Sequence, residues 1–203
     1  MREHTLITIS RQYGSAGKEA AEHLARKMKV RCYDRQILYL AADKLGKSDL
    51  DIETILEISY KKPKENIGSI FESIGSLGLD TIPSYNEMYK EQAKVIREIA
   101  KKESAVFVGR CADAILKDFP ECYRFFVYAE DEFREQRAKE FYDNLSLKEL
   151  EKEDKMRERY YNYYTGQKWG DPNNYDLMIN ASQLSPEKIA ELIWKYVEFR
   201  QNQ

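Results

Sequence analysis

The sequence is poor in the residues on which several classes of enzyme and binding protein depend. It has two histidines, which lie in no metal-ligand spacing and leave few candidates for a serine–histidine or cysteine–histidine mechanism. Its three cysteines are odd in number and show no Cys-x-x-Cys spacing, so we expect neither a disulfide framework nor a zinc site. The sequence shows no apolar run long enough to span a membrane and no signal peptide. These absences predict a protein of the reducing cytoplasm with no membrane association.

An excess of positive charge is also missing. Charged residues make up 33% of the 203 residues, yet the formal net charge is −2. Because nonspecific binding to DNA or RNA relies on a basic face that neutralises phosphates, the sequence argues against a nucleic-acid partner. The length suits one domain, residues 1–203, with room for a helical insertion. The composition indicates no particular oligomeric state.

The segment from residue 6 to residue 26 has the pattern of a strand, a loop and a helix. Residues 6–9 are apolar and β-branched, which is typical of a short buried strand, and small apolar residues at helical spacing follow Lys18. Between strand and helix, Gly14 and Gly17 let the backbone curl, so that its N–H groups and the positive end of the helix dipole aim at one point. Lys18 can reach phosphate oxygens there as a point charge. The segment therefore predicts a phosphate-binding loop.

This loop departs from the P-loop pattern, which is Gly, any four residues, Gly-Lys and then Ser or Thr. The chain keeps Gly17 and Lys18, but Gln12 stands in place of the first glycine and Glu19 in place of the hydroxyl. The alternative interpretation is a strand-to-helix turn that binds no ligand. The predicted cofactor-binding residues are Gly14, Ser15, Ala16, Gly17, Lys18 and Glu19.

The rest of the chain alternates predicted strands and helices. Further strands are predicted at residues 30–33, 105–108, 123–128 and 175–180. Strands that alternate with helical patterns favour a parallel sheet with helices on its faces. We therefore expect an α/β fold with about five strands.

Two of the predicted strands end in residues that can bind a ligand. Open α/β sheets bind ligands at the carboxyl ends of their strands. Asp34 and Arg35 follow one strand, and Gly109 and Arg110 follow another, where an arginine can bind a phosphate with two hydrogen bonds. The alternative for the first pair is a helix N-cap, Asp34, beside an exposed arginine.

A helical insertion is predicted at residues 46–103, because this stretch is mostly helical by pattern and has no clear strand. Three lysines at positions 61, 62 and 64 could face a phosphate there. The alternative is an ordinary run of solvated charges.

A lid is predicted at residues 131–170. Arg134 and Arg137 lie three positions apart on one helical face, so their guanidinium groups could converge on one anion. The alternative is local pairing with carboxylates, which are Glu130, Asp131 and Glu140. A highly charged helix follows, and its aromatic end, residues 160–169, could stack a base or pin the helix to the sheet.

Four stretches, at residues 7–15, 33–35, 108–113 and 160–171, together resemble the cytidylate kinase-like proteins, a divergent branch beside the true cytidylate kinases. The resemblance covers nearly the whole chain. It implies the fold of the nucleoside monophosphate kinases: a P-loop NTPase-type parallel sheet of about five strands flanked by helices, with a helical monophosphate-binding insertion and a helical lid. It also implies ATP-dependent phosphoryl transfer to a nucleoside monophosphate, CMP or dCMP first, with ATP and Mg²⁺ as cofactors.

The resemblance assigns donor and acceptor roles to individual residues. Gly17 and Lys18 would hold the donor phosphates, and Asp34 would lie near the acceptor nucleotide. Gly109 and Arg110 resemble the middle of an Asp-Gly-Arg-Asp turn that holds the cytidylate. The substrate-binding residues that we predict are Asp34, Arg35, Gly109, Arg110, Asp154 and Arg157.

The resemblance also assigns residues of the lid. Asp154 and Arg157 resemble an Asp-x-x-Arg element that contacts the monophosphate, while Arg134 and Arg137 resemble lid arginines. The predicted catalytic residues are Lys18, Arg134, Arg137 and Arg157.

The chain differs from the family's pattern at three positions. Val108 and Cys111 replace both acids of the turn, and Glu19 replaces the P-loop hydroxyl. The metal ligands are therefore not predicted. A hydrated magnesium ion held mainly by nucleotide phosphates is compatible with the sequence, and Ser15 and Asp113 are candidates to assist it.

Phosphoryl transfer needs in-line positioning and cations more than covalent help from the protein. A monophosphate acceptor is already anionic at neutral pH and needs no general base. One alternative is a kinase for a small-molecule hydroxyl, which would want Asp34 or Asp113 as its base. A nucleotide-binding protein without catalysis is a second alternative, favoured by the missing hydroxyl, and a structural or interaction protein is a third.

Overall fold

The computed structural model describes residues 4–46 and 85–202. Most of the predicted insertion, including its three lysines, lies outside these residues. The chain divides into two compact units, which are described separately: Met1–Asp34 with Ile99–Gln203, and Arg35–Glu98.

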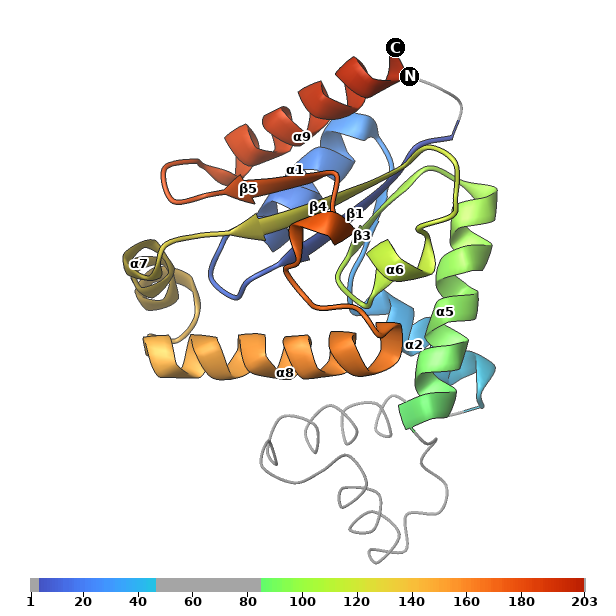
Figure 1. The fold of residues 1–203 in the computed structure, drawn as a ribbon, viewed down its shortest axis with the longest axis horizontal. Helices are drawn as coiled ribbons and strands as arrows, with labels where there is room; N and C mark the ends of the chain where they lie inside the picture. The colour runs from blue at the N-terminus through green and yellow to red at the C-terminus, as the bar shows by residue number, and fades with distance from the viewer. Residues whose placement is uncertain (1–3, 47–84, 203) are drawn as a thin grey trace, which may run out of the picture. The chain divides into compact units, whose positions relative to one another are not determined.

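The first unit is built on a five-stranded parallel sheet, as predicted (Figure 1). Its strands stand in the order β2-β3-β1-β4-β5. Their bounds are β1 Leu6–Arg11, β2 Arg31–Tyr33, β3 Ala105–Val108, β4 Cys122–Tyr128 and β5 Leu177–Asn180. Because all the strands are parallel, their carboxyl ends, and the loops that follow them, meet at one edge.

Helices flank this sheet. Those of the first unit are α1 Gly17–Met28, α6 Ala112–Ile115, α7 Asp131–Phe141, α8 Leu147–Thr165 and α9 Pro186–Gln201, and a 3₁₀ turn lies at Pro172–Asn174. Helices α1 and α9 pack against each other on one face of the sheet (Figure 1). The second unit contains α2 Gln36–Lys44 and most of α5 Tyr85–Lys102.

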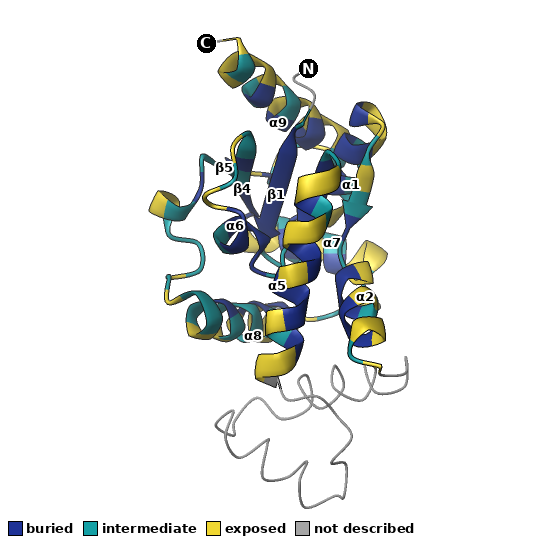
Figure 2. Cartoon of the chain, turned by 90° about the vertical axis from the view of Figure 1, so that its right-hand side faces the viewer, coloured by how far each residue is buried: buried dark blue, intermediate teal, exposed yellow. Residues whose placement is uncertain are grey.

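The central strand β1 is buried along its length, as Figure 2 shows. Ile7 and Ile9 face α1 and belong to a core that also contains Leu24 of α1 and Ile189 and Ile193 of α9. Alternate residues of a strand point to opposite faces. Burial on both faces explains why β1 and β3 are nearly continuous apolar runs in the sequence.

Two helix starts are as the sequence predicts. Ser146 and Glu149 form a capping box at the start of α8, and Ser185 caps α9 with Pro186 in the first turn. The boundaries of β5 differ: the predicted strand began at residue 175, whereas β5 begins at Leu177. In the part of the chain that the structure describes, no helix is both long and apolar enough to cross a membrane.

Candidate active site

The loop between β1 and α1 is anchored at its first residue. The backbone N–H of Gln12 donates to the carbonyl of Val127, and its side-chain oxygen accepts from the N–H of Ala129 at 3.1 Å. The side chain of Gln12 therefore extends to the end of β4 instead of crowding the loop. This contact explains how a glutamine occupies the place of the first P-loop glycine.

Two residues of the loop adopt the left-handed backbone conformation that lets the chain turn sharply: Gly14 at φ 79° and Ala16 at φ 63°. The hydroxyl of Ser15 is fully buried and donates to the carbonyl of Gln12 at 2.9 Å, so it closes the loop internally. Gly17 matters for space, because a Cβ there would lie 2.7 Å from the Cβ of Arg11. The backbone thus forms a tight turn at the start of α1.

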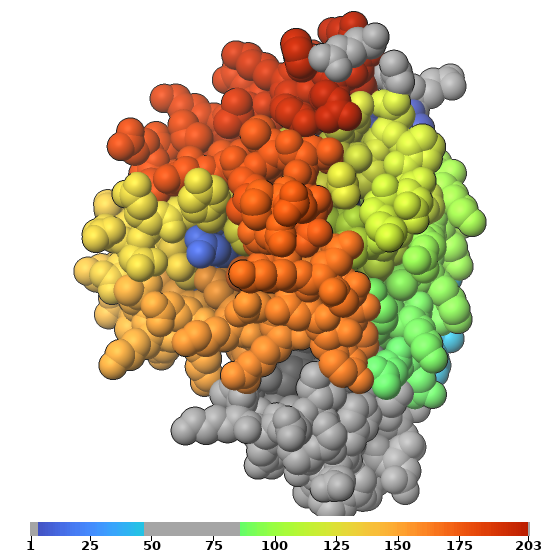
Figure 3. Space-filling model, viewed as in Figure 1, coloured from blue at the N-terminus to red at the C-terminus, as the bar shows by residue number. Residues whose placement is uncertain are grey.

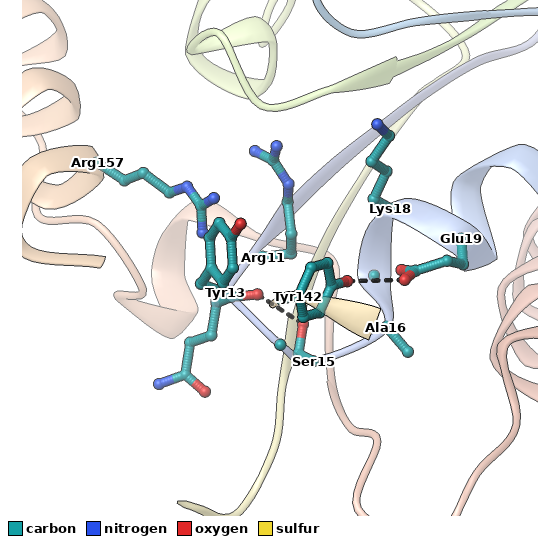
Figure 4. Close-up of a pocket in the computed structure, with 11 residues that line it drawn as sticks. Arg11, Tyr13, Ser15, Ala16, Lys18, Glu19, Tyr142 and Arg157 are labelled. Carbon is teal, nitrogen blue, oxygen red and sulfur yellow. Dashed lines mark hydrogen bonds between the residues drawn. The ribbon is translucent and has the colours of Figure 1, made fainter. Parts of the chain in front are cut away.

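A pocket lies at this turn, lined by residues 11–19 together with Tyr142 and Arg157 (Figure 4). Part of the N-terminal segment reaches the surface between the segment around α7 and the segment of α8 (Figure 3, blue among yellow and orange). Lys18, whose side chain is 53% exposed, and Arg11 extend to the same side of the loop. The predicted cofactor-binding residues therefore line one pocket.

Asp34, at the end of β2, faces both of these cations. Its Oδ2 lies 3.7 Å from Nζ of Lys18, and its Oδ1 lies 3.7 Å from Nη2 of Arg11. The predicted donor-side and acceptor-side residues Lys18 and Asp34 are thus neighbours. Arg11 was not among the residues predicted to form the site, although it belongs to the stretch that carries the family resemblance.

A second carboxylate, Asp154 of α8, is hydrogen-bonded to the other side of the loop. The N–H of Tyr13 donates to Asp154 Oδ1 at 2.7 Å, and the carbonyl of Tyr13 accepts from Nε of Arg134 at 2.8 Å. Arg134 also forms an ion pair with Asp154. Arg157 donates to Asp154 Oδ1 at 3.2 Å, and the guanidinium of Arg157 lies over the ring of Tyr13, 4.7 Å from the ring centre. Burial raises the pKa of Asp154, whereas the Tyr13 N–H and the two arginines act in the opposite direction.

Glu19 contributes a third ion pair at the pocket. Its Oε1 accepts from Nη2 of Arg137 at 2.8 Å and from the hydroxyl of Tyr142 at 2.7 Å. Burial and the hydrogen bond to Glu19 raise the pKa of Tyr142 to about 12, so this hydroxyl stays protonated and donates. Among the described residues, Glu19 Oε2 is buried and has no hydrogen-bond partner. The sequence could not indicate these contacts, which link residues more than a hundred positions apart.

The turn after β3 places Gly109 at φ 66° and Arg110 at φ 58°. A Cβ on Gly109 would lie 2.4 Å from Nη1 of Arg11, so this glycine leaves room for the Arg11 side chain. Arg110 is partly exposed and shows no hydrogen bond or ion pair to other described residues. It lies at the carboxyl edge of the sheet, next to the strand that holds the loop.

Asp113 is buried behind this turn. Its carboxylate accepts from the hydroxyl of Tyr161 at 2.6 Å and from Ser10 at 3.4 Å. Burial raises the pKa of Asp113, and these hydrogen bonds oppose the shift. Tyr161 thus attaches α8 to α6, and Trp169, in the segment after α8, packs edge-on against Phe126 of β4 at 5.1 Å.

Of the predicted site residues, Arg35 is the one that falls in the second unit, where it is exposed at the start of α2. The others lie in the first unit. The structure brings together the loop residues, Lys18 and Asp34 in one cluster, and Arg134, Asp154 and Arg157 in a second. Each of Arg134, Arg137 and Arg157 contacts a carboxylate.

The strand order and the loop between β1 and α1 define a P-loop kinase type of fold. The family model of the cytidylate kinase-like family matches residues 6–183, and the chain belongs to this family.

Solved structures agree with this assignment of the fold. An uncharacterized protein from Eubacterium ventriosum is 25% identical, with a TM-score of 0.69 over 96% of this chain and 99% of that one. Shikimate kinase from Acinetobacter baumannii is 15% identical (TM-score 0.55; 98% and 96% covered), and a gluconokinase from Sinorhizobium meliloti is 11% identical (TM-score 0.55; 98% and 99% covered). The similarity to the shikimate kinase and to the gluconokinase concerns the fold alone. No curated protein matches the sequence.

Proposed function

We propose that the protein transfers a phosphoryl group from ATP to a nucleoside monophosphate, with CMP or dCMP as the first candidates. The observation that carries this proposal is the pocket lined by a P-loop-type turn, whose Lys18 lies 3.7 Å from Asp34, in a chain of the cytidylate kinase-like family. Family and fold support phosphoryl transfer in general, and the monophosphate acceptor is the more specific part of the proposal.

In this proposal the loop residues 14–19 hold the donor phosphates. Their backbone N–H groups and the amino end of α1 favour anions, and Lys18 adds a mobile charge. Arg110 and Arg157 bind the acceptor phosphate, and the lid spans residues 131–170. The helical insertion at residues 46–103 and the role of Arg35 in substrate binding stay predictions from the sequence. Arg134 and Arg137 act as lid arginines only if each exchanges its carboxylate for a phosphate.

The described residues fit a magnesium ion that arrives with the nucleotide. Magnesium is usually held by one or two carboxylates together with substrate phosphates and water. Glu19 stands where the P-loop hydroxyl is expected, and its Oε2 is a carboxylate oxygen without a protein partner among the described residues. We propose that Glu19, rather than the internally bonded Ser15 or the buried Asp113, is the protein group that would hold the ion. When bound, magnesium neutralises charge on the transferred group.

A coupled assay of ADP release across the nucleoside monophosphates tests the proposal. We expect turnover with a cytidine monophosphate and a loss of about 10²–10³ in kcat for Lys18→Ala, which is typical when one stabilising cation or donor is removed. Lys27→Ala, at the exposed far end of the same helix, is the matched control and should retain wild-type activity. Folded protein that turns over none of the monophosphates would refute the proposal.

A small-molecule hydroxyl is the second candidate acceptor. Asp34 favours it, because this carboxylate lies beside Lys18 and is partly exposed, whereas Asp113 is buried and hydrogen-bonded. The fold neighbours named shikimate kinase and gluconokinase are consistent with such an acceptor. If Asp34 is a general base, Asp34→Asn should abolish turnover and Arg110→Ala should affect it less. Tight ATP binding without any turnover would instead support a nucleotide-binding protein.

A further inference from the structure

Arg11 occupies a position that neither the P-loop pattern nor the family resemblance assigns to a ligand. It is the last residue of β1, and its side chain runs from the start of α1 to the turn after β3. Two glycines make room for it. A Cβ on Gly17 would lie 2.7 Å from Arg11 Cβ, and a Cβ on Gly109 would lie 2.4 Å from Arg11 Nη1. The missing side chains at both positions define a channel that the arginine fills.

This channel directs the guanidinium to the carboxyl edge of the sheet. One end of the group lies at Gly109, after β3, and the other lies 3.7 Å from Asp34, after β2. Arg11 also lines the pocket with the phosphate-binding turn. The guanidinium therefore stands between the loop that would hold a donor and the strand ends where an acceptor would bind.

The charges around Arg11 suit a phosphoryl group. Arg11 and Lys18 both face the carboxylate of Asp34, so these three side chains together carry a net positive charge. Both separations are 3.7 Å, which is longer than a hydrogen bond. Arg11 lines the pocket together with Lys18, so both cations lie where a phosphoryl group held by the loop would bind.

We propose that Arg11 binds the terminal phosphoryl group of the donor and stabilises it during transfer. Its planar fork can bind two phosphate oxygens at once, opposite the point charge of Lys18. In the transfer, an acceptor oxygen forms a bond to the terminal phosphorus. The bond from that phosphorus to the bridging oxygen breaks, and the nucleoside diphosphate leaves with the electron pair. Arg11 is then a catalytic residue.

This inference rests on the proposed function in one respect, since the loop must bind a nucleoside triphosphate. Titration calorimetry with ADP and with the non-hydrolysable β,γ-imido analogue of ATP tests it without any turnover. In wild-type protein the analogue should bind more tightly than ADP. Arg11→Ala and the neutral Arg11→Gln should each lose at least about tenfold in affinity for the analogue and less than twofold for ADP, because a hydrogen-bonded charge contact costs roughly 1.5–3 kcal/mol when removed. Arg11→Lys should lose less.

Arg31→Ala is the matched control. Arg31 lies at the amino end of the same sheet, where its exposed guanidinium pairs with Glu103. The Arg31→Ala variant loses the same charge at a distance from the pocket, so its affinities for ADP and for the ATP analogue should both be unchanged. Arg11→Gln keeps most of the side-chain stem, so it also reports on Arg11 if the alanine variant does not fold.

The outcomes separate this inference from the function on which it rests. An unchanged ratio of the two affinities in folded Arg11→Gln protein, or an equal loss for both nucleotides, would overturn the role of Arg11 and leave the kinase proposal standing. If wild-type protein bound neither nucleotide, both would fail. Where an acceptor is turned over, loss of Arg11 should also lower kcat by about 10³ or more, as for an arginine that acts on the transition state, with the KM of the acceptor little changed.

Discussion

Asp154 and Asp34 are two carboxylates that each face two cations on opposite sides of the same loop. Asp154 is largely buried, accepts a backbone N–H and bonds directly to Arg134 and Arg157. Asp34 is partly exposed and stands 3.7 Å from both Arg11 and Lys18. The first cluster therefore stabilises the loop, whereas the second leaves its cations within reach of an anion. Charge alone would not distinguish the two roles, but contact distance does.

Asp154→Ala should have the largest effect on stability. It leaves the guanidinium of Arg134, which is 3% exposed, buried without its carboxylate, and breaking such a pair costs about 3–5 kcal/mol. Urea denaturation measures this loss. Asp131→Ala removes a second, exposed partner of Arg134 and should cost only about 0–1 kcal/mol. Equal effects of the two variants would show that Asp154 is not a structural clasp.

Tyr161→Phe tests Asp113, a buried carboxylate that pairs with no cation in the described part of the chain. It removes the hydroxyl that donates to Asp113, and we expect a loss of about 1–3 kcal/mol in the free energy of unfolding. Tyr163→Phe, on the exposed side of the same helix, is the control and should be nearly neutral. A neutral result for Tyr161→Phe as well would mean that this hydrogen bond adds little to the attachment of α8.

The pH dependence of stability should report Asp113 separately. Burial raises the pKa of Asp113 above that of the unfolded chain, which is near 3.9. Between these two pKa values the folded state binds more protons than the unfolded state, so this contribution to stability is present at low pH and is lost as the pH rises. Relative to Asp113→Asn, the wild-type protein should therefore lose stability from about pH 4 upward. If the difference in the free energy of unfolding between the wild-type protein and Asp113→Asn did not vary with pH, it would contradict the raised pKa of Asp113.

Asp34→Asn should cost less stability than Asp154→Ala, because the isosteric amide keeps an oxygen that can accept hydrogen bonds and the ion pairs lost with the charge are long, at 3.7 Å to both Arg11 and Lys18. The effect of Asp34→Asn on ligand binding should be larger than its effect on stability. Removing the negative charge makes the surroundings of Arg11 and Lys18 more positive, so calorimetry should show tighter binding of the ATP analogue. A loss of stability comparable to that of Asp154→Ala would remove the contrast between the two carboxylates.

The sheet was largely predictable from the sequence. Strands buried on both faces are continuous apolar runs, so β1 and β3 stand out without further information. The start of β5 was placed too early. The N–H of Asp176 still donates to the carbonyl of Arg124, but the N–H of Arg124 donates to the side chain of Asp176 and not to a backbone carbonyl. Local chemistry also revealed the helix caps of α8 and α9, which depend on residues within one turn.

The partners of charged residues in the site were not predictable in the same way. Arg134 does contact Asp131, one of its local candidates, but it also bonds to Asp154, twenty positions away. Arg137 pairs with Glu19 rather than with Glu140 in the described part of the chain. Spacing along a helix shows which residues share a face, and only the tertiary fold decides what that face meets. The assignment of catalytic and substrate-binding residues therefore stays a prediction.

The two hydrogen bonds that hold the backbone of Tyr13 have a mechanical consequence. Two side chains, one from α7 and one from α8, hold the N–H and the carbonyl of a single residue at the mouth of the phosphate turn. A tilt or slide of these helices must carry that residue with it, since releasing it would strand two polar backbone groups. A movement of α7 or α8 would therefore also change the shape of the pocket that Tyr13 lines.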